Sequence, residues 1–133
     1  MKSVSFTKDF YRAISNLFYS FSMIDKTMSV QEKKEIVWAV KQEWATNEYG
    51  FDSEELIYET MRSLIKEKQN ADQAFEKFKV FFIANKELFS KDVKQELLEA
   101  CHKICNADHG KNKSELILLT KLHKLIKTSN LNN

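Results

Sequence analysis

Proline is absent from this sequence of 133 residues, and glycine occurs only twice, at Gly50 and Gly110. Neither Asn-Gly nor Asp-Gly, the dipeptides that favour tight hairpin turns, occurs. Charged residues make up 30%, and most of them are Lys and Glu, which are good helix formers on exposed faces. The composition therefore predicts an all-α protein without a sheet, and the length suits one domain with a single core.

Other features that are scarce exclude further classes of protein. The formal net charge is only +2, there are two arginines, Arg12 and Arg62, and no basic stripe follows the chain as nucleic-acid binding requires. The longest apolar stretches, Ile36–Val40 and Val80–Ala84, are far too short to span a membrane. The segment MKSVSFTKDF is charged and lacks the apolar region of a secretory signal. We therefore expect a soluble cytoplasmic protein that binds no nucleic acid.

Apolar residues recur at helical spacing along almost the whole chain. We expect one domain over residues 1–133, a bundle of six helices, or of seven if the stretch 71–107 is divided differently. The residues expected to face the core are Phe10, Ile14, Leu17, Phe18, Phe21, Ile36, Val37, Val40, Trp44, Ile57, Tyr58, Met61, Leu64, Ile65, Phe75, Phe78, Phe81, Phe82, Val93, Leu97, Ala100, Ile104, Ala107, Leu116, Leu119, Leu122 and Leu125.

Two acidic loops carry the main functional signal. Asp25 precedes Glu32 by seven positions, Asp108 precedes Glu115 by the same interval, and 83 positions separate the two pairs. Each pair lies between two apolar helical runs, so the chain contains two similar helix–acidic loop–helix units. Because related units commonly pair, we expect both loops at one end of the bundle. Four converging carboxylates there would be ligands for a hard divalent cation, Ca²⁺ or Mg²⁺.

Helix capping explains half of this pattern without a metal. Glu32 and Glu115 are at the third helical position, where a carboxylate accepts the N–H of the cap residue. Asp25 and Asp108 instead follow helix C-termini, where the helix dipole disfavours negative charge, so a lysine, backbone N–H groups or a cation must compensate. The loops are not EF-hands, because the Glu arrives at position 8 and not at position 12. Metal binding and simple capping both stay open.

Two segments resemble a known family. Residues 106–115, NADHGKNKSE, resemble the A-D-G-x-(loop)-E signature of the tellurite-resistance B (TerB-like) family, and residues 23–32, MIDKTMSVQE, resemble its first copy. The resemblance covers most of the chain and implies an all-helical domain with two pseudo-repeated units, an acidic metal-binding patch and a bacterial stress or tellurite-resistance setting. Lys26 replaces the glycine of the first loop, so we expect that loop to take a left-handed turn less readily.

The expected function is that of a non-enzymatic module that binds a divalent cation, a partner protein, or both, through the acidic loops. The alternatives are a metal-dependent hydrolase that uses the same carboxylates and a purely structural interaction domain. Cys101, Cys105 and His109 have i, i+4, i+8 spacing, but three ligands on one straight helix seldom surround one zinc ion. A disulfide between positions i and i+4 does not fit a regular helix, so we expect both cysteines to be reduced. Cys101 aligns with Phe18 of the first unit and is expected in the core. His102 and His123 are expected to be solvated or boundary residues.

Overall fold

The computed structural model describes residues 6–107 and 112–131, and every regular element in these ranges is helical. Six α-helices occur there: α1 (Lys8–Met23), α2 (Val30–Ala39), α3 (Ser53–Lys66), α4 (Ala71–Ala84), α5 (Lys91–Asn106) and α6 (Lys113–Leu131). A short π-helix, η1 (Val40–Trp44), continues α2, and a 3₁₀ turn, η2 (Lys86–Leu88), follows α4. The all-α prediction is therefore confirmed for the described part of the chain. None of these helices is both long and apolar enough to cross a bilayer.

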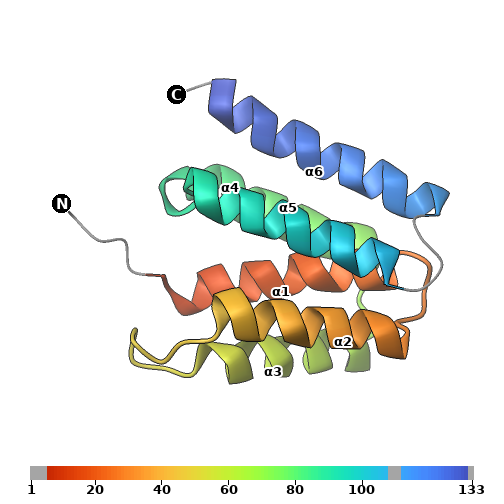
Figure 1. The fold of residues 1–133 in the computed structure, drawn as a ribbon, viewed down its shortest axis with the longest axis horizontal. Helices are drawn as coiled ribbons and strands as arrows, with labels where there is room; N and C mark the ends of the chain where they lie inside the picture. Colours follow the sequence, from red (N-terminus) through yellow and green to blue (C-terminus); the bar gives the residue numbers. More distant parts are fainter. Residues whose placement is uncertain (1–5, 108–111, 132–133) are drawn as a thin grey trace.

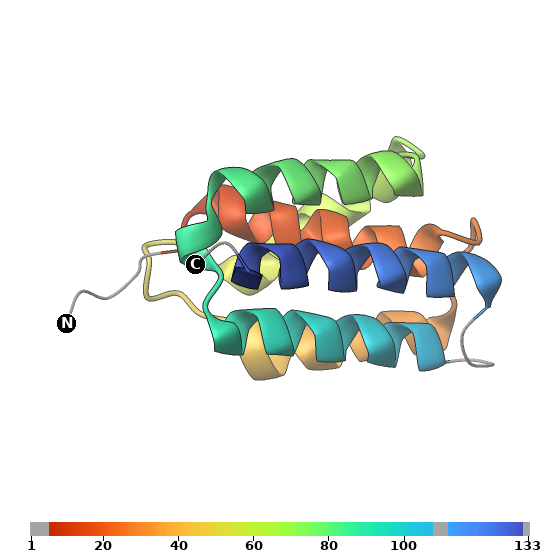
Figure 2. The ribbon, with the colours of Figure 1, turned by 90° about the horizontal axis from the view of Figure 1, so that it is seen from above.

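The helices run back and forth along one axis, with α1 in the middle of the bundle (Figure 1). α1 has its most extensive contacts with α3 and α4, and it also contacts α5 and α2. α2 packs on α5, and α6 packs on the outer side of α5. Seen from above, α6 lies between α4 and α5 (Figure 2). α1 is therefore the central helix, and α6 is an outer helix on the side of the bundle away from α2 and α3.

The sequence of α1 suits this central place. From Phe10 to Ser22 every residue except Arg12 is buried, and a helix that is buried all round must lie inside the molecule. Its serines donate to backbone carbonyls of the preceding turn, as in the bond from Ser15 Oγ to Tyr11 O at 2.7 Å, so their hydroxyls are satisfied without solvent.

Reciprocal capping boxes begin α2 and α6. At α2, Ser29 N–H donates to Glu32 Oε1 at 2.8 Å, and Glu32 N–H donates to Ser29 Oγ at 3.0 Å. At α6, Asn112 N–H donates to Glu115 Oε1 at 3.0 Å, and Glu115 N–H donates to Asn112 Oδ1 at 2.9 Å. The capping that the sequence predicts at both glutamates is therefore confirmed.

Most of the residues expected in the core are buried, but three are not. Val37, Ile65 and Leu116 are 37%, 41% and 50% exposed. In α2 the buried stripe includes Ile36 and Ala39, and Val37 falls beside it because an outer helix buries only one narrow face. The expected positions Tyr58, Phe81, Ala107 and Leu125 are partly buried.

Candidate functional site

The helices on either side of the two predicted acidic loops meet at one end of the bundle. The C-terminus of α1 and the N-terminus of α2 lie there, beside the C-terminus of α5 and the N-terminus of α6 (Figure 1). Asp25, Glu32 and Glu115 belong to the described residues, and Asp108 lies outside them. We call the region around Asp25, Glu32 and Glu115 the acidic end.

Two carboxylates of the acidic end are buried. Glu32 is 5% exposed and Glu115 is 3% exposed. Burial raises the pKa of Glu32 above its ordinary value, the hydrogen bonds with Ser29 oppose this rise, and the negative charges of Asp25 and Glu115 add to it. Asp25 and Glu115 therefore lie close enough to Glu32 for their charges to act on its carboxyl group.

The loop between α1 and α2 takes the left-handed turn that the sequence makes unfavourable. Lys26 has a φ of 76°, and its N–H donates to Met23 O at 2.8 Å. A lysine in this conformation costs on the order of 1 kcal/mol, yet the turn forms without glycine. Asp25 is exposed, and its Oδ1 accepts the N–H of Thr27 at 3.4 Å. This backbone N–H is one of the compensating groups expected for an aspartate that follows a helix C-terminus.

The described residues complete neither the four-carboxylate site nor a site formed by Cys101, Cys105 and His109. No three His, Cys, Asp or Glu side chains among residues 6–107 and 112–131 are placed to hold one metal ion. Asp25, Glu32 and Glu115 therefore do not form a metal site by themselves. The four-carboxylate site stays a prediction, since it also includes Asp108. Cys101 and Cys105 are buried free thiols, as expected. Burial raises the pKa of Cys101 well above its ordinary value, which opposes the thiolate that a soft metal needs. His109 lies outside the described residues.

A second carboxylate pair, which we did not predict from the sequence, lies between η1 and α5. Glu96 forms a side-chain hydrogen bond with Glu43. Burial, this hydrogen bond and the charges of Glu43, Asp92 and Glu99 together raise the pKa of Glu96 to about 7. The pair borders a cavity of about 70 Å³ that Trp44 also lines. Glu43 is part of the π-helical turn, a wider turn that changes the direction of its side chain and is frequent at functional sites.

Glu96→Gln is expected to flatten the dependence of stability on pH between about 4.5 and 7. The folded state holds the Glu96 proton more tightly than the unfolded chain, because the pKa rises from 4.5 to about 7 on folding. The free energy of unfolding should therefore fall as the pH rises through this window. Gln keeps a hydrogen-bond donor and carries no charge, so the variant should be more stable than the wild type at pH 8 by roughly 1 kcal/mol, a value reduced for partial solvation.

Urea unfolding at pH 4.5, 6 and 8 measures this difference. Glu59→Gln, a change on an exposed face of α3, is the control and should leave the pH profile unchanged. Parallel profiles for the wild type and Glu96→Gln would contradict the raised pKa of Glu96.

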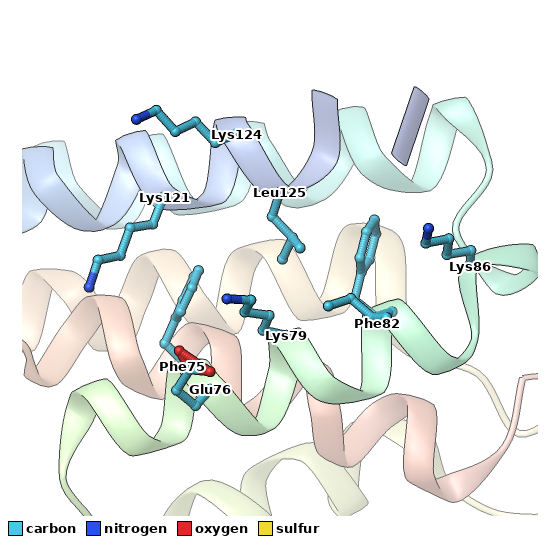
Figure 3. Close-up of a pocket in the computed structure, with 9 residues that line it drawn as sticks. Phe75, Glu76, Lys79, Phe82, Lys86, Lys121, Lys124 and Leu125 are labelled. Carbon is cyan, nitrogen blue, oxygen red and sulfur yellow. The ribbon is translucent and has the colours of Figure 1, made fainter. Parts of the chain in front are cut away.

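A groove of about 490 Å³ lies between α4 and α6. Phe75, Phe82 and Leu125 give it an apolar floor, and Lys79 and Lys121 lie beside them (Figure 3). The other residues that line it are Glu76, Ile83, Lys86 and Lys124. The chemistry of this groove suits an anionic ligand with an apolar body, so its charge preference is opposite to that of the acidic end.

His123 is exposed and His102 is partly buried, as expected. The sequence did not indicate that the two residues contact each other. The two rings contact each other between α5 and α6, with Nε2 atoms 3.1 Å apart. The residues are 21 positions apart in the chain, so no local sequence pattern indicates the contact. Glu43 and Glu96 are likewise far apart in the chain, so no local sequence pattern indicates that they interact. A helical spacing shows which face of a helix a residue occupies, and the packing of two helices decides which faces meet.

Comparison with known proteins identifies no relative. No family model matches the chain, and no curated protein or solved structure matches it. The TerB-like family therefore stays a resemblance carried by residues 23–32 and 106–115.

Proposed function

We propose that this chain is a non-enzymatic, TerB-like helical module whose acidic end binds a divalent cation. The supporting observation is that Glu32 and Glu115, two buried carboxylates from different helices, act on each other electrostatically, with Asp25 nearby. Neighbouring like charges with little access to water are unfavourable. A hard cation such as Ca²⁺ or Mg²⁺ removes the repulsion and accepts carboxylate and loop carbonyl oxygens as ligands.

Capping accounts for where each glutamate lies along its helix but not for the effect of the Glu115 charge on Glu32. A cap and the helix dipole stabilise one negative charge by about 1 kcal/mol, and a second carboxylate close by opposes that gain. A cation would neutralise both carboxylates at once. It would also link the first turn of α2 to the first turn of α6. Asp108 is proposed as the fourth ligand, since it precedes Glu115 as Asp25 precedes Glu32.

Ca²⁺ or Mg²⁺ is expected to raise the melting temperature of the metal-free protein. A ligand that binds only the folded state stabilises it by about 2.7 kcal/mol at a concentration of 100 times its Kd. Glu32→Gln and Glu115→Gln should reduce the rise, because each removes one charged ligand. Asp108→Asn should reduce it more than Asp25→Asn, because the second loop keeps Gly110 and the fuller motif. Differential scanning fluorimetry and calorimetric titration measure both effects.

Asp9→Asn is the matched control. Asp9 is an exposed acid in the first turn of α1, which begins at the other end of the bundle (Figure 1), so this variant should respond to the ions as the wild type does. If millimolar Ca²⁺, Mg²⁺ and Mn²⁺ give neither heat nor a thermal shift, capping is the full explanation of the acidic end. The chain would then be treated as a protein-interaction domain.

A further inference from the structure

His102 on α5 and His123 on α6 bring their imidazole rings together at the surface. The Nε2 atoms are 3.1 Å apart, and the ring centroids are 5.4 Å apart with the rings inclined at 69°. His123 is exposed and His102 is partly buried, so ions in solution can reach the pair. The two helices that carry them pack directly on each other.

The separation of the two nitrogens fits a shared metal ion. An imidazole nitrogen binds Zn²⁺ at about 2.0–2.1 Å. Two nitrogens at that distance from one ion are about 3.3 Å apart at a tetrahedral angle and about 2.9 Å apart at a square-planar angle. The observed 3.1 Å lies between these values. The centroid separation of 5.4 Å shows that the rings now point end-on at each other. Each ring must therefore turn by about 40° before both lone pairs face one ion.

We propose that His102 and His123 form a two-histidine site for a first-row transition ion that favours imidazole, namely Zn²⁺, Ni²⁺ or Cu²⁺. Each neutral ring binds through Nε2 and carries its proton on Nδ1. No third metal ligand lies beside them among residues 6–107 and 112–131. Water would take the other coordination positions, so the site is open and its ion exchanges. The bound ion holds α6 against α5.

A hydrogen bond between two neutral rings is the competing account of the same distance. The two accounts differ in the position of one proton. The hydrogen bond needs a proton on one Nε2, whereas the metal needs the lone pairs of both. On metal binding this proton moves to Nδ1 of the same ring by exchange with water. Protonation of the rings at acidic pH expels the ion.

The site is independent of the acidic end. It uses nitrogen ligands, which suit Zn²⁺, Ni²⁺ and Cu²⁺, whereas carboxylates and carbonyls suit Ca²⁺ and Mg²⁺. Zn²⁺ binding should therefore survive a large excess of Mg²⁺ and the change Glu32→Gln. If the acidic end binds no cation, Zn²⁺ binding by His102 and His123 can still be measured, and the reverse also holds.

Calorimetric titration with ZnCl₂ at pH 7.5 tests the proposal. We expect one ion per chain, a higher melting temperature and loss of binding at pH 5. His123→Ala should weaken Zn²⁺ binding by more than tenfold, because changes to residues behind a ligand already cost about 10–100-fold. His123 is exposed, so this variant should keep its fold. His102→Gln is the second variant, since Gln fills much of the same space. With Cu²⁺, electron paramagnetic resonance should show two coordinated nitrogens in the wild type and one in each variant.

His109→Ala is the matched control, because His109 is the third histidine of the chain and lies outside the described residues. It should bind Zn²⁺ as the wild type does. Three results would overturn the proposal: no Zn²⁺ binding by the wild type, unchanged binding by His123→Ala, or loss of binding in His109→Ala alone. The first would leave the contact as a hydrogen bond, and the other two would move the ion to different residues.

Discussion

Phe10→Ala is expected to lower the free energy of unfolding by about 3–5 kcal/mol, the usual cost of removing a buried aromatic ring. Phe10 is fully buried near the start of α1. Its ring centroid lies 5.4 Å from that of Phe89, which follows η2, and 6.1 Å from that of Trp44 at the end of η1. The substitution would therefore leave a cavity where three separate segments meet.

Urea unfolding followed by tryptophan fluorescence measures this loss, since Trp44 is part of the affected cluster of rings. Val80→Ala is the control, because Val80 is 65% exposed on α4, and a surface change of this kind should stay within about 0.5 kcal/mol. A loss below about 1 kcal/mol for Phe10→Ala would contradict the packing of α1 against η1 and Phe89.

The buried place of Phe10 is also an example of what could be predicted from the sequence. Its burial follows from the spacing of apolar residues along one helix, which is a local pattern. The capping boxes at Glu32 and Glu115 are local too, because the partners are three residues apart. Features of this kind account for the buried residues of α1 and for the starts of α2 and α6.

Features that depend on neighbouring helices were predicted less well. Leu116 has the spacing of a core residue, but α6 is an outer helix. Its buried face is formed by Leu118, Leu119 and Leu122, and Leu116 lies at the exposed edge of that face. Ile36, Val40 and Trp44 have the spacing of one continuous α-helix, whereas the turn Val40–Trp44, η1, is a π-helix. Nothing in the residues of that turn distinguishes it from an α-helix before it packs.

The candidate sites also combine local features, which the sequence predicts, with contacts between helices, which it does not predict. The sequence places Glu32 and Glu115 in equivalent positions, and the bundle brings their charges within range of each other. The Glu43–Glu96 and His102–His123 pairs join residues far apart in the chain, so helical periodicity alone gives no reason to pair them. At Lys26 the sequence makes a left-handed turn unfavourable, but the helices on either side of the loop impose it.

Ser53→Ala is expected to cost about 1–3 kcal/mol, the penalty for leaving buried backbone groups without a partner. Ser53 is fully buried at the start of α3. Its hydroxyl accepts the N–H of Thr46 at 2.8 Å and donates to Trp44 O at 2.6 Å. One oxygen atom thus holds the last residue of η1 and the loop after it against α3. Alanine removes this oxygen and leaves both backbone groups unsatisfied.

Urea unfolding of Ser53→Ala should be compared with that of Ser63→Ala, a control on the same helix whose exposed hydroxyl contacts only Glu67 at 3.3 Å and should matter little. Because Ser53 fixes the end of η1, its loss should also loosen Glu43 from Glu96 and reduce the fall in stability between pH 4.5 and 7. Equal stabilities for the two serine variants would mean that other groups hold this end of η1. A large loss with an unchanged pH profile would mean that Ser53 fixes the loop but not the turn that carries Glu43.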